Sequence, residues 1–168
     1  TENDKQAVRD FEDEVRQKMA RGHKNFKMKV GRGAMHMPLY KGNRRDIELI
    51  NAVRGVIGKD AYLMIDPNNG YNLNITKEVL YETRASNVYW IEEAFHEDDV
   101  MYNWLKEWMG ETGIKTLIAD GEGGTRRSPK LVEWARRGLI DVLQPDIVWD
   151  GFVFWLKYAR MLDGYGIL

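Results

Sequence analysis

The chain has 168 residues, of which 30% are charged and 43% are hydrophobic, and its formal net charge is −1. This composition is that of one globular domain with a core of its own, and the small net charge gives no reason to expect a nucleic acid or an anionic membrane as partner. No run approaches the ~18 apolar residues of a membrane span. There is no cysteine, which excludes disulfides, thiolate metal sites and cysteine nucleophiles and favours a cytoplasmic location.

One unit recurs along the chain after a predicted helix over residues 5–21: a short apolar run, polar residues or glycine, and then a longer amphipathic stretch. The apolar runs, which we interpret as strands, are 26–30, 61–65, 88–91, 115–119 and 140–144. The predicted helices between and after them are 44–57, 76–84, 98–109, 128–137 and 151–162. The last residues, G-Y-G-I-L (164–168), resemble the start of a sixth strand. Strands that alternate with helices predict a parallel α/β sheet with right-handed crossovers.

Two architectures fit this alternation. One is a partial (β/α)8 barrel of the TIM type, with about five to six parallel strands and outer helices; a complete barrel usually needs about 250 residues. The other is an open, doubly wound sheet. The two differ in strand order, because barrel strands are neighbours in chain order whereas a doubly wound sheet reverses its order at a switch point. We expect the partial barrel.

Two local predictions accompany this interpretation. Asn43 or Asp46 is placed to cap the helix predicted from residue 44. Four residues of the last helix fall at helical spacing and should pack on the sheet: Phe152, Trp155, Leu156 and Ala159.

The first strand, F-K-M-K-V-G, alternates apolar and charged residues. Phe26, Met28 and Val30 should face the core, which leaves Lys27 and Lys29 together on the opposite face. These two lysines are either a solvated surface or the charged lining of a site.

Polar and ionisable residues stand at the end of every predicted strand. Ligands and catalytic groups of parallel α/β folds lie at the carboxyl ends of the strands, so these residues should share one rim. After the two lysines they are, strand by strand, Asp66 and Asn68, Glu92 and Glu93, Asp120 and Glu122, and Gln144 and Asp146.

Three carboxylates of this rim, those of Asp66, Glu92 and Glu122, come from consecutive strands and should converge. Like charges in one place repel, so each carboxylate would resist ionising unless a positive charge lies among them. Pairing with nearby arginine and lysine side chains is one solution. A bound metal is the other, and oxygen ligands without cysteine or histidine suit a hard cation such as Mg2+.

The ordered set of motifs K-x-K, D-x-N, W-I-E-E, G-E and Q-P-D, each at the end of a successive strand, resembles the enolase superfamily of mandelate racemase and muconate lactonizing enzyme-like proteins. The pattern is most similar to the mandelate racemase branch, and it runs from about Phe26 to the C-terminus. The resemblance implies that residues 1–168 are an incomplete C-terminal barrel domain, without the capping domain and the last barrel strands. It also implies a homo-oligomeric full-length parent.

The resemblance implies roles for the rim. Asp66, Glu92 and Glu122 match the three Mg2+ ligands of the family, and Asn68 matches a residue beside the metal. Lys29 matches the catalytic acid/base. A lysine with an ordinary pKa of about 10.4 is protonated near neutral pH, and the neighbouring ammonium of Lys27 is expected to lower the pKa of Lys29 and to contact substrate.

Further residues are assigned in the same way. Asp146 matches the aspartate that orients a catalytic histidine on the next strand, which is expected beyond Leu168. Arg32 and His36, in the loop 31–42, could reach a polyhydroxy acid, although plain surface is an equally good interpretation of that loop. Two positions depart from the family pattern: Ala94 stands where proline is usual, and a usual glycine pair is replaced within residues 149–151.

The implied reaction is Mg2+-dependent abstraction of the proton α to a carboxylate of a small-molecule substrate. Dehydration of an acid sugar by a carbon–oxygen lyase is the first expectation, and racemisation or epimerisation of a 2-hydroxy acid is the alternative. A third interpretation, of another class, is that residues 1–168 alone are an inactive half-barrel that only binds metal or self-associates, because exposed sheet edges favour association.

Overall fold

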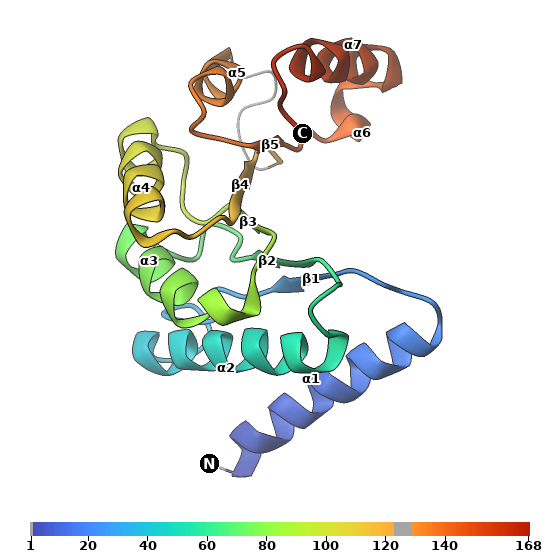
Figure 1. The fold of residues 1–168 in the computed structure, drawn as a ribbon, viewed down its shortest axis with the longest axis vertical. Helices are drawn as coiled ribbons and strands as arrows, with labels where there is room; N and C mark the ends of the chain where they lie inside the picture. The colour runs from blue at the N-terminus through green and yellow to red at the C-terminus, as the bar shows by residue number, and fades with distance from the viewer. Residues whose placement is uncertain (1, 123–128) are drawn as a thin grey trace. The chain divides into compact units, whose positions relative to one another are not determined.

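The computed structural model describes residues 2–122 and 129–168, and in it strands and helices alternate along the chain (Figure 1). The five strands are β1 (Phe26–Lys29), β2 (Leu63–Asp66), β3 (Trp90–Glu92), β4 (Leu117–Asp120) and β5 (Val142–Leu143). They form one sheet in the order β1-β2-β3-β4-β5. This chain order is that of a partial barrel, so the predicted fold class is confirmed and the doubly wound alternative is wrong.

The strands are connected by helices. These are α1 (Glu2–Ala20), α2 (Leu39–Ile57), α3 (Leu73–Glu82), the short 3-10 helix η1 (Arg84–Ser86), α4 (Asp99–Thr112), α5 (Pro129–Arg136), α6 (Ile147–Asp150) and α7 (Phe152–Asp163). Ser128, where the fourth helical stretch was predicted to begin, lies outside the described residues. No helix among the described residues is long and apolar enough to cross a membrane.

The chain divides into two compact units. The first comprises residues 1–95 with 114–116, and the second comprises residues 96–113 with 117–168. Each unit has its own buried core and is described by itself.

In the first unit, β1, β2 and β3 pair in parallel. Lys29 is in register with Asp66, and Ile65 is in register with Ile91, so Lys29, Asp66 and Glu92 end their strands at the same level. The predicted alternation of β1 is confirmed, because Met28 is buried while both lysines are exposed. The core of this unit is made of aliphatic side chains of the strands and of α2 and α3: Met28, Ile50, Val53, Leu63, Ile65, Val79, Leu80 and Ile91.

Helix α2 begins five residues earlier than predicted. Pro38, with φ −52° and ψ 137°, stands directly before Leu39, the first helical residue, and its fixed φ suits the start of a helix. Asn43 and Asp46 therefore lie inside α2, and the prediction that one of them caps it is wrong. Asp46 is instead completely buried, with a different role that is described below.

In the second unit, β4 and β5 pair in parallel, with Asp120 in register with Leu143. The N–H of Leu168 donates to the carbonyl of Asp141 at 3.1 Å, and the carbonyl of Leu168 accepts from the N–H of Leu143 at 3.0 Å. This is the bonding pattern of a parallel ladder. The prediction that residues 164–168 begin a further strand is therefore confirmed for Leu168.

The predicted packing of α7 is wrong for two of its four residues. Phe152 is 63% exposed and Leu156 is 37% exposed, whereas Trp155 is half-buried and its indole N–H donates to the carbonyl of Pro145 at 3.2 Å. Within the second unit β5 has only two residues and offers this helix little sheet to cover.

Candidate active site

The rim of the first unit brings together the two lysines of β1 and the acids that end β2 and β3. The ammonium of Lys29 donates to Asp66 Oδ2 at 2.5 Å and to Asn68 Oδ1 at 2.6 Å. The ammonium of Lys27 lies 2.6 Å from Glu92 Oε1 and 3.2 Å from Asp66 Oδ2. Five of the predicted site residues, Asn68 among them, therefore form one connected group.

Local backbone geometry explains this convergence. The two lysines are two positions apart, which is one period of a strand, so both project from the same face of β1. The parallel register places Asp66 and Glu92 beside them. Both carboxylates are buried, at 0% and 1% exposure, while the lysine side chains remain 35% and 58% exposed. At the rim, two buried carboxylates therefore pair with two partly exposed ammonium groups.

The protonation of this group follows from burial and pairing. Burial would raise the pKa of Asp66, but hydrogen bonds from Lys29, Lys27 and the Asn68 N–H hold that pKa below its ordinary value. Burial raises the pKa of Glu92, and the adjacent Asp66 carboxylate adds to this against the attraction of Lys27. Burial would lower the pKa of Lys27, but its hydrogen bonds and charge interactions with Glu92 and Asp66 raise it. Lys27 is therefore a stable cation between two acids.

Asn68 connects this group to Glu93, a rim residue for which sequence reasoning predicted no role. The Asn68 side-chain amide donates to Glu93 Oε2 at 3.2 Å, and the Asn69 N–H donates to the Glu93 carbonyl at 2.7 Å. Asn68, Asn69 and Glu93 all have left-handed backbones, with φ of 51°, 61° and 44°. The signal that could have identified Glu93 is its place in the W-I-E-E motif, directly after a predicted metal ligand.

The structure places Arg32 against a buried acid. Its guanidinium donates to Asp46 Oδ1 at 2.7 Å and lies 5.4 Å from the centre of the Phe11 ring. Asp46 Oδ2 also accepts from the N–H groups of Gly31 and Arg32 at 2.8 and 3.1 Å, and from the Tyr71 hydroxyl at 3.0 Å. These contacts favour a structural role for Arg32, and its assignment to substrate stays a prediction.

His36 lies in the same loop with an exposed side chain, and its backbone N–H donates to the Arg32 carbonyl at 3.1 Å. Its predicted contact with substrate also stays a prediction. Sequence reasoning missed Asp46, which had been interpreted as a helix cap. The signal that could have identified it is an acid on the apolar face of an amphipathic helix, close to the isoleucines of the core.

The predicted rim residues of the second unit have local roles. Asp120 is buried, accepts from the Tyr102 hydroxyl, and accepts from the Gly121 N–H at 2.6 Å. Glu122 follows with an exposed side chain. Asp146 caps α6 by accepting from the Val148 N–H at 2.9 Å. Its predicted role in orienting a histidine stays a prediction.

The donor set of the first unit fits a hard cation. Asp66 and Glu92 are buried carboxylates that already share one positive charge, the ammonium of Lys27, and carboxylate oxygens are what Mg2+ prefers. Pairing with basic residues, the alternative considered from the sequence, is therefore realised for these two acids. Within residues 2–122 and 129–168, no group of three acidic or histidine side chains lies close enough together to hold a metal ion.

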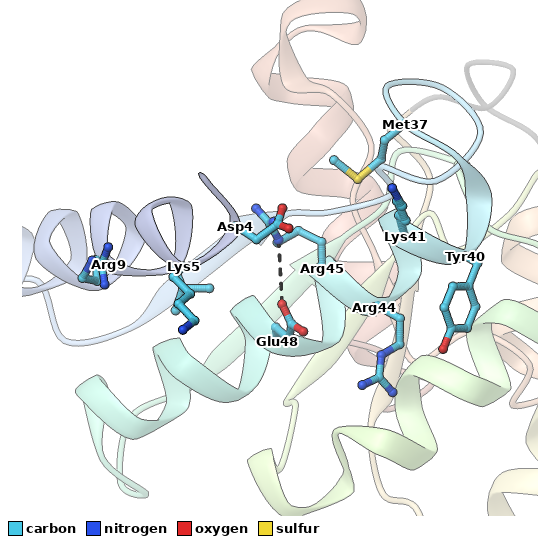
Figure 2. Close-up of a pocket in the computed structure, with 10 residues that line it drawn as sticks. Asp4, Lys5, Arg9, Met37, Tyr40, Lys41, Arg44, Arg45 and Glu48 are labelled. Carbon is cyan, nitrogen blue, oxygen red and sulfur yellow. Dashed lines mark hydrogen bonds and ion pairs between the residues drawn. The ribbon is translucent and has the colours of Figure 1, made fainter. Parts of the chain in front are cut away.

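A separate cavity of about 770 Å3 lies between α1 and α2 (Figure 2). Five of its ten lining residues are basic: Asp4, Lys5, Val8, Arg9, Met37, Tyr40, Lys41, Arg44, Arg45 and Glu48. Arg45 pairs with Asp4 and lies 3.8 Å from Glu48, so one arginine forms ion pairs with both acids of the cavity. None of the predicted site residues lines it.

The fold and the rim define a parallel α/β barrel-type protein with paired lysines facing carboxylates at the strand ends. Residues 10–168 match the family described as enolase C-terminal domain-like, and the chain belongs to this family.

Solved structures show the same relationship. Galacturonate dehydratase from Geobacillus sp., complexed with D-galacturonate and 5-keto-4-deoxy-D-galacturonate, is 50% identical, with a TM-score of 0.94 over 98% of this chain and 44% of that chain. A mutant of galacturonate dehydratase from Geobacillus sp., complexed with Mg, is 49% identical with a TM-score of 0.94, over 98% of this chain and 42% of that one.

Curated relatives agree with this assignment. Arabinonate dehydratase of Saccharolobus solfataricus is 26% identical over 149 residues, which are 89% of this chain and 36% of that protein. D-Gluconate dehydratase of Thermoproteus tenax is 25% identical over 158 residues, which are 94% of this chain and 31% of that protein. The chain thus spans about a third of the length of these two relatives.

Proposed function

We propose that the protein containing this chain is a Mg2+-dependent dehydratase of an acid sugar, with hexuronic acids such as D-galacturonate as the first class to test. The observation that carries the proposal is the arrangement at the rim of the first unit: Lys29 between Asp66 and Asn68, with Lys27 shared by Asp66 and Glu92. The 50% identity to galacturonate dehydratase supports this choice of substrate class.

Lys29 is the proposed acid/base. As a neutral amine, it takes the proton from the carbon next to the substrate carboxylate, and the electron pair of that C–H bond forms a carbon–carbon double bond. The hydroxyl on the next carbon leaves as water with a proton from the second acid/base. The resulting enol becomes a ketone by moving its hydroxyl proton to carbon. Lys27 keeps the buried acids neutralised, and Asn68 offers an amide to substrate hydroxyls. Asp146 would orient a second acid/base, expected to be a histidine.

Asp66, Glu92 and Glu122 are the residues that would hold Mg2+. When bound, the metal ion would supply positive charge next to the substrate carboxylate, which makes its α-proton more acidic. The buried, already cation-sharing carboxylates of Asp66 and Glu92 support this assignment, and Glu122 is included on the strength of the G-E motif.

Dehydration is favoured over racemisation by the relative's bound product. The galacturonate dehydratase complex contains 5-keto-4-deoxy-D-galacturonate, in which the ketone and the missing hydroxyl are on the two carbons nearest the carboxylate. That outcome is the one expected when a base removes the α-proton and a β-hydroxyl leaves. Racemisation would return the proton and leave both hydroxyls in place.

The test is a turnover screen of the full natural protein in D2O with Mg2+. D-Galacturonate, D-gluconate and D-arabinonate represent acid sugars, and mandelate represents 2-hydroxy acids. Ketone formation is detected with semicarbazide, and deuterium at the α-carbon is detected by NMR. We expect ketone from at least one acid sugar and none from a Lys29→Met variant. Deuterium without ketone would favour the racemase alternative, and neither signal from any acid would contradict the proposed function.

A further inference from the structure

We propose that Glu93 is a positioning residue that holds the side-chain amide of Asn68 with its oxygen toward Lys29. This inference rests on the proposed function, in which Lys29 is the acid/base. It assigns a role to the second acid of the E-E pair, which does not match a metal ligand of the family pattern.

The geometry is a chain of three side chains. The Lys29 ammonium donates to Asn68 Oδ1 at 2.6 Å, and Asn68 Nδ2 donates to Glu93 Oε2 at 3.2 Å. Asn68 is exposed on the open rim, whereas Glu93 is only 3% exposed. A buried carboxylate therefore anchors an amide that would otherwise be free to rotate at the surface.

The chemistry of the two neighbours allows one amide orientation. An ammonium only donates hydrogen bonds, and an ionised carboxylate only accepts them. Asn68 must therefore turn its oxygen to Lys29 and its nitrogen to Glu93, because the opposite orientation would set N–H against ammonium and oxygen against carboxylate. Without the Glu93 carboxylate, the Asn68 nitrogen loses this acceptor, and only the contact of the Asn68 oxygen with Lys29 constrains the amide.

The backbone supplies an independent observation. Two consecutive strand residues point to opposite faces of a sheet, so Glu92 and Glu93 could not both reach the rim from a continued strand. Glu93 leaves the extended conformation with φ 44°, and its carboxylate reaches the loop after β2. A left-handed backbone costs a non-glycine residue free energy and is found preferentially at functional sites. Hydrogen bonds from Asn69 to the Glu93 carbonyl and from Tyr71 to the Ala94 carbonyl hold this turn.

The experiment compares three Glu93 variants of the full natural protein, with the acid that the wild type converts best. In Glu93→Ala we expect kcat and the rate of α-proton exchange in D2O to fall about 10-fold to 100-fold, because small displacements of positioning groups have effects of that size, while KM changes by about twofold or less. Glu93→Gln keeps an acceptor oxygen and should recover most of the lost rate. Glu78→Ala, an exposed acid on α3, is the matched control and should behave like the wild type.

Glu93→Gly separates positioning from folding. Glycine accepts a positive φ without strain, so the melting temperature should stay at or above that of the wild type while kcat falls as in Glu93→Ala. Wild-type kcat in both Glu93→Ala and Glu93→Gly would overturn the inference, and so would a loss of rate that follows a loss of folded protein in both. An inactive wild type would instead contradict the proposed function, and the inference would fall with it.

Discussion

Lys27 is the residue on which the charge balance of the rim depends. Its one ammonium is shared by two buried carboxylates. Burial raises the pKa of Glu92 in spite of Lys27. At the other two groups hydrogen bonds outweigh burial: those from Lys29 and Lys27 hold the pKa of Asp66 below its ordinary value, and those to Glu92 and Asp66 raise the pKa of Lys27. Asp66 and Glu92 therefore form a pair of buried acids that attracts positive charge. This property is the structural basis for assigning the acids to Mg2+.

A first prediction at the scale of single residues concerns Glu92. Glu92→Gln keeps the shape of the side chain but removes one anionic ligand, and ligand charge is a main determinant of affinity for such cations. Calorimetric titration of the full natural protein with Mg2+ should show affinity reduced about tenfold or more. Glu14→Gln, an exposed acid on α1, should bind like the wild type. Equal binding by Glu92→Gln and the wild type would remove Glu92 from the site.

A second prediction concerns Tyr71, whose hydroxyl donates to the buried Asp46. Burial, followed by the Asp46 charge, raises the pKa of Tyr71 well above its ordinary value. Because this folded-state pKa exceeds the unfolded value of about 10, the neutral phenol contributes stability that is fully present below pH ~10 and is lost as the pH rises through the folded-state pKa.

Denaturant unfolding from pH 8 to 11 tests this directly. At pH 8, Tyr71→Phe should lower the free energy of unfolding by about 1.5–3 kcal/mol, the usual contribution of a hydrogen bond to a charged group. The difference in the free energy of unfolding between variant and wild type should become smaller above pH ~10, because the wild type loses the contribution of the neutral phenol there. Tyr40→Phe, at a 71% exposed tyrosine, is the control. A gap that stays constant up to pH 11 would contradict the role given to Tyr71.

At the scale of elements, the turn after β1 connects the lysine strand to the loop after β2. Gly31 has φ 81°, and a Cβ at this position would meet the Pro67 carbonyl oxygen at 2.5 Å. Asp46 of α2 accepts hydrogen bonds from the backbone N–H groups of Gly31 and Arg32 in the same turn. The positions of Lys29, Asp66 and Asn68 relative to one another therefore depend on a close backbone approach that only glycine allows.

Gly31→Ala should lower the free energy of unfolding by about 2–5 kcal/mol, the sum of left-handed strain and overpacking. The matched control is Gly22→Ala, because Gly22 has φ 94° but no atom within 4 Å of its Cβ position. It should cost only the strain, about 1–2 kcal/mol. Equal losses in the two variants, measured by denaturant unfolding, would show that the approach to Pro67 is not tight.

The sequence was informative about strands and less so about helix starts. Period-two alternation in β1 correctly predicted which face holds Lys27 and Lys29, because a strand leaves only two faces to choose from. The partners of these lysines could not be predicted, since they depend on the register between strands far apart in the sequence. Asp46 shows a further limit: an acid near a helix start suggests a cap, but a buried acid that satisfies four donors has the same local sequence.

At the scale of the whole molecule, the strand order and the motifs agree. Five strands follow in chain order, as the partial barrel predicts, and the residues 10–168 that match the enolase C-terminal domain-like family include all five. The strand-end motifs taken together predicted the candidate site better than any single motif or residue, because each motif alone is common. The left-handed turn at Glu93 and the contacts of Arg32 were not predictable, since both depend on backbone conformations that the sequence does not specify.

The central claim is that Lys29 removes the proton next to a substrate carboxylate. The most direct measurement is the distance from Lys29 Nζ to the α-carbon of D-galacturonate, or of the best acid from the screen, in a crystal structure of the full natural protein with Mg2+. We expect about 3–3.5 Å, the separation of reacting atoms in a productive complex. The claim would be contradicted if the ammonium stayed bonded to Asp66 and Asn68 while another side chain faced the α-carbon.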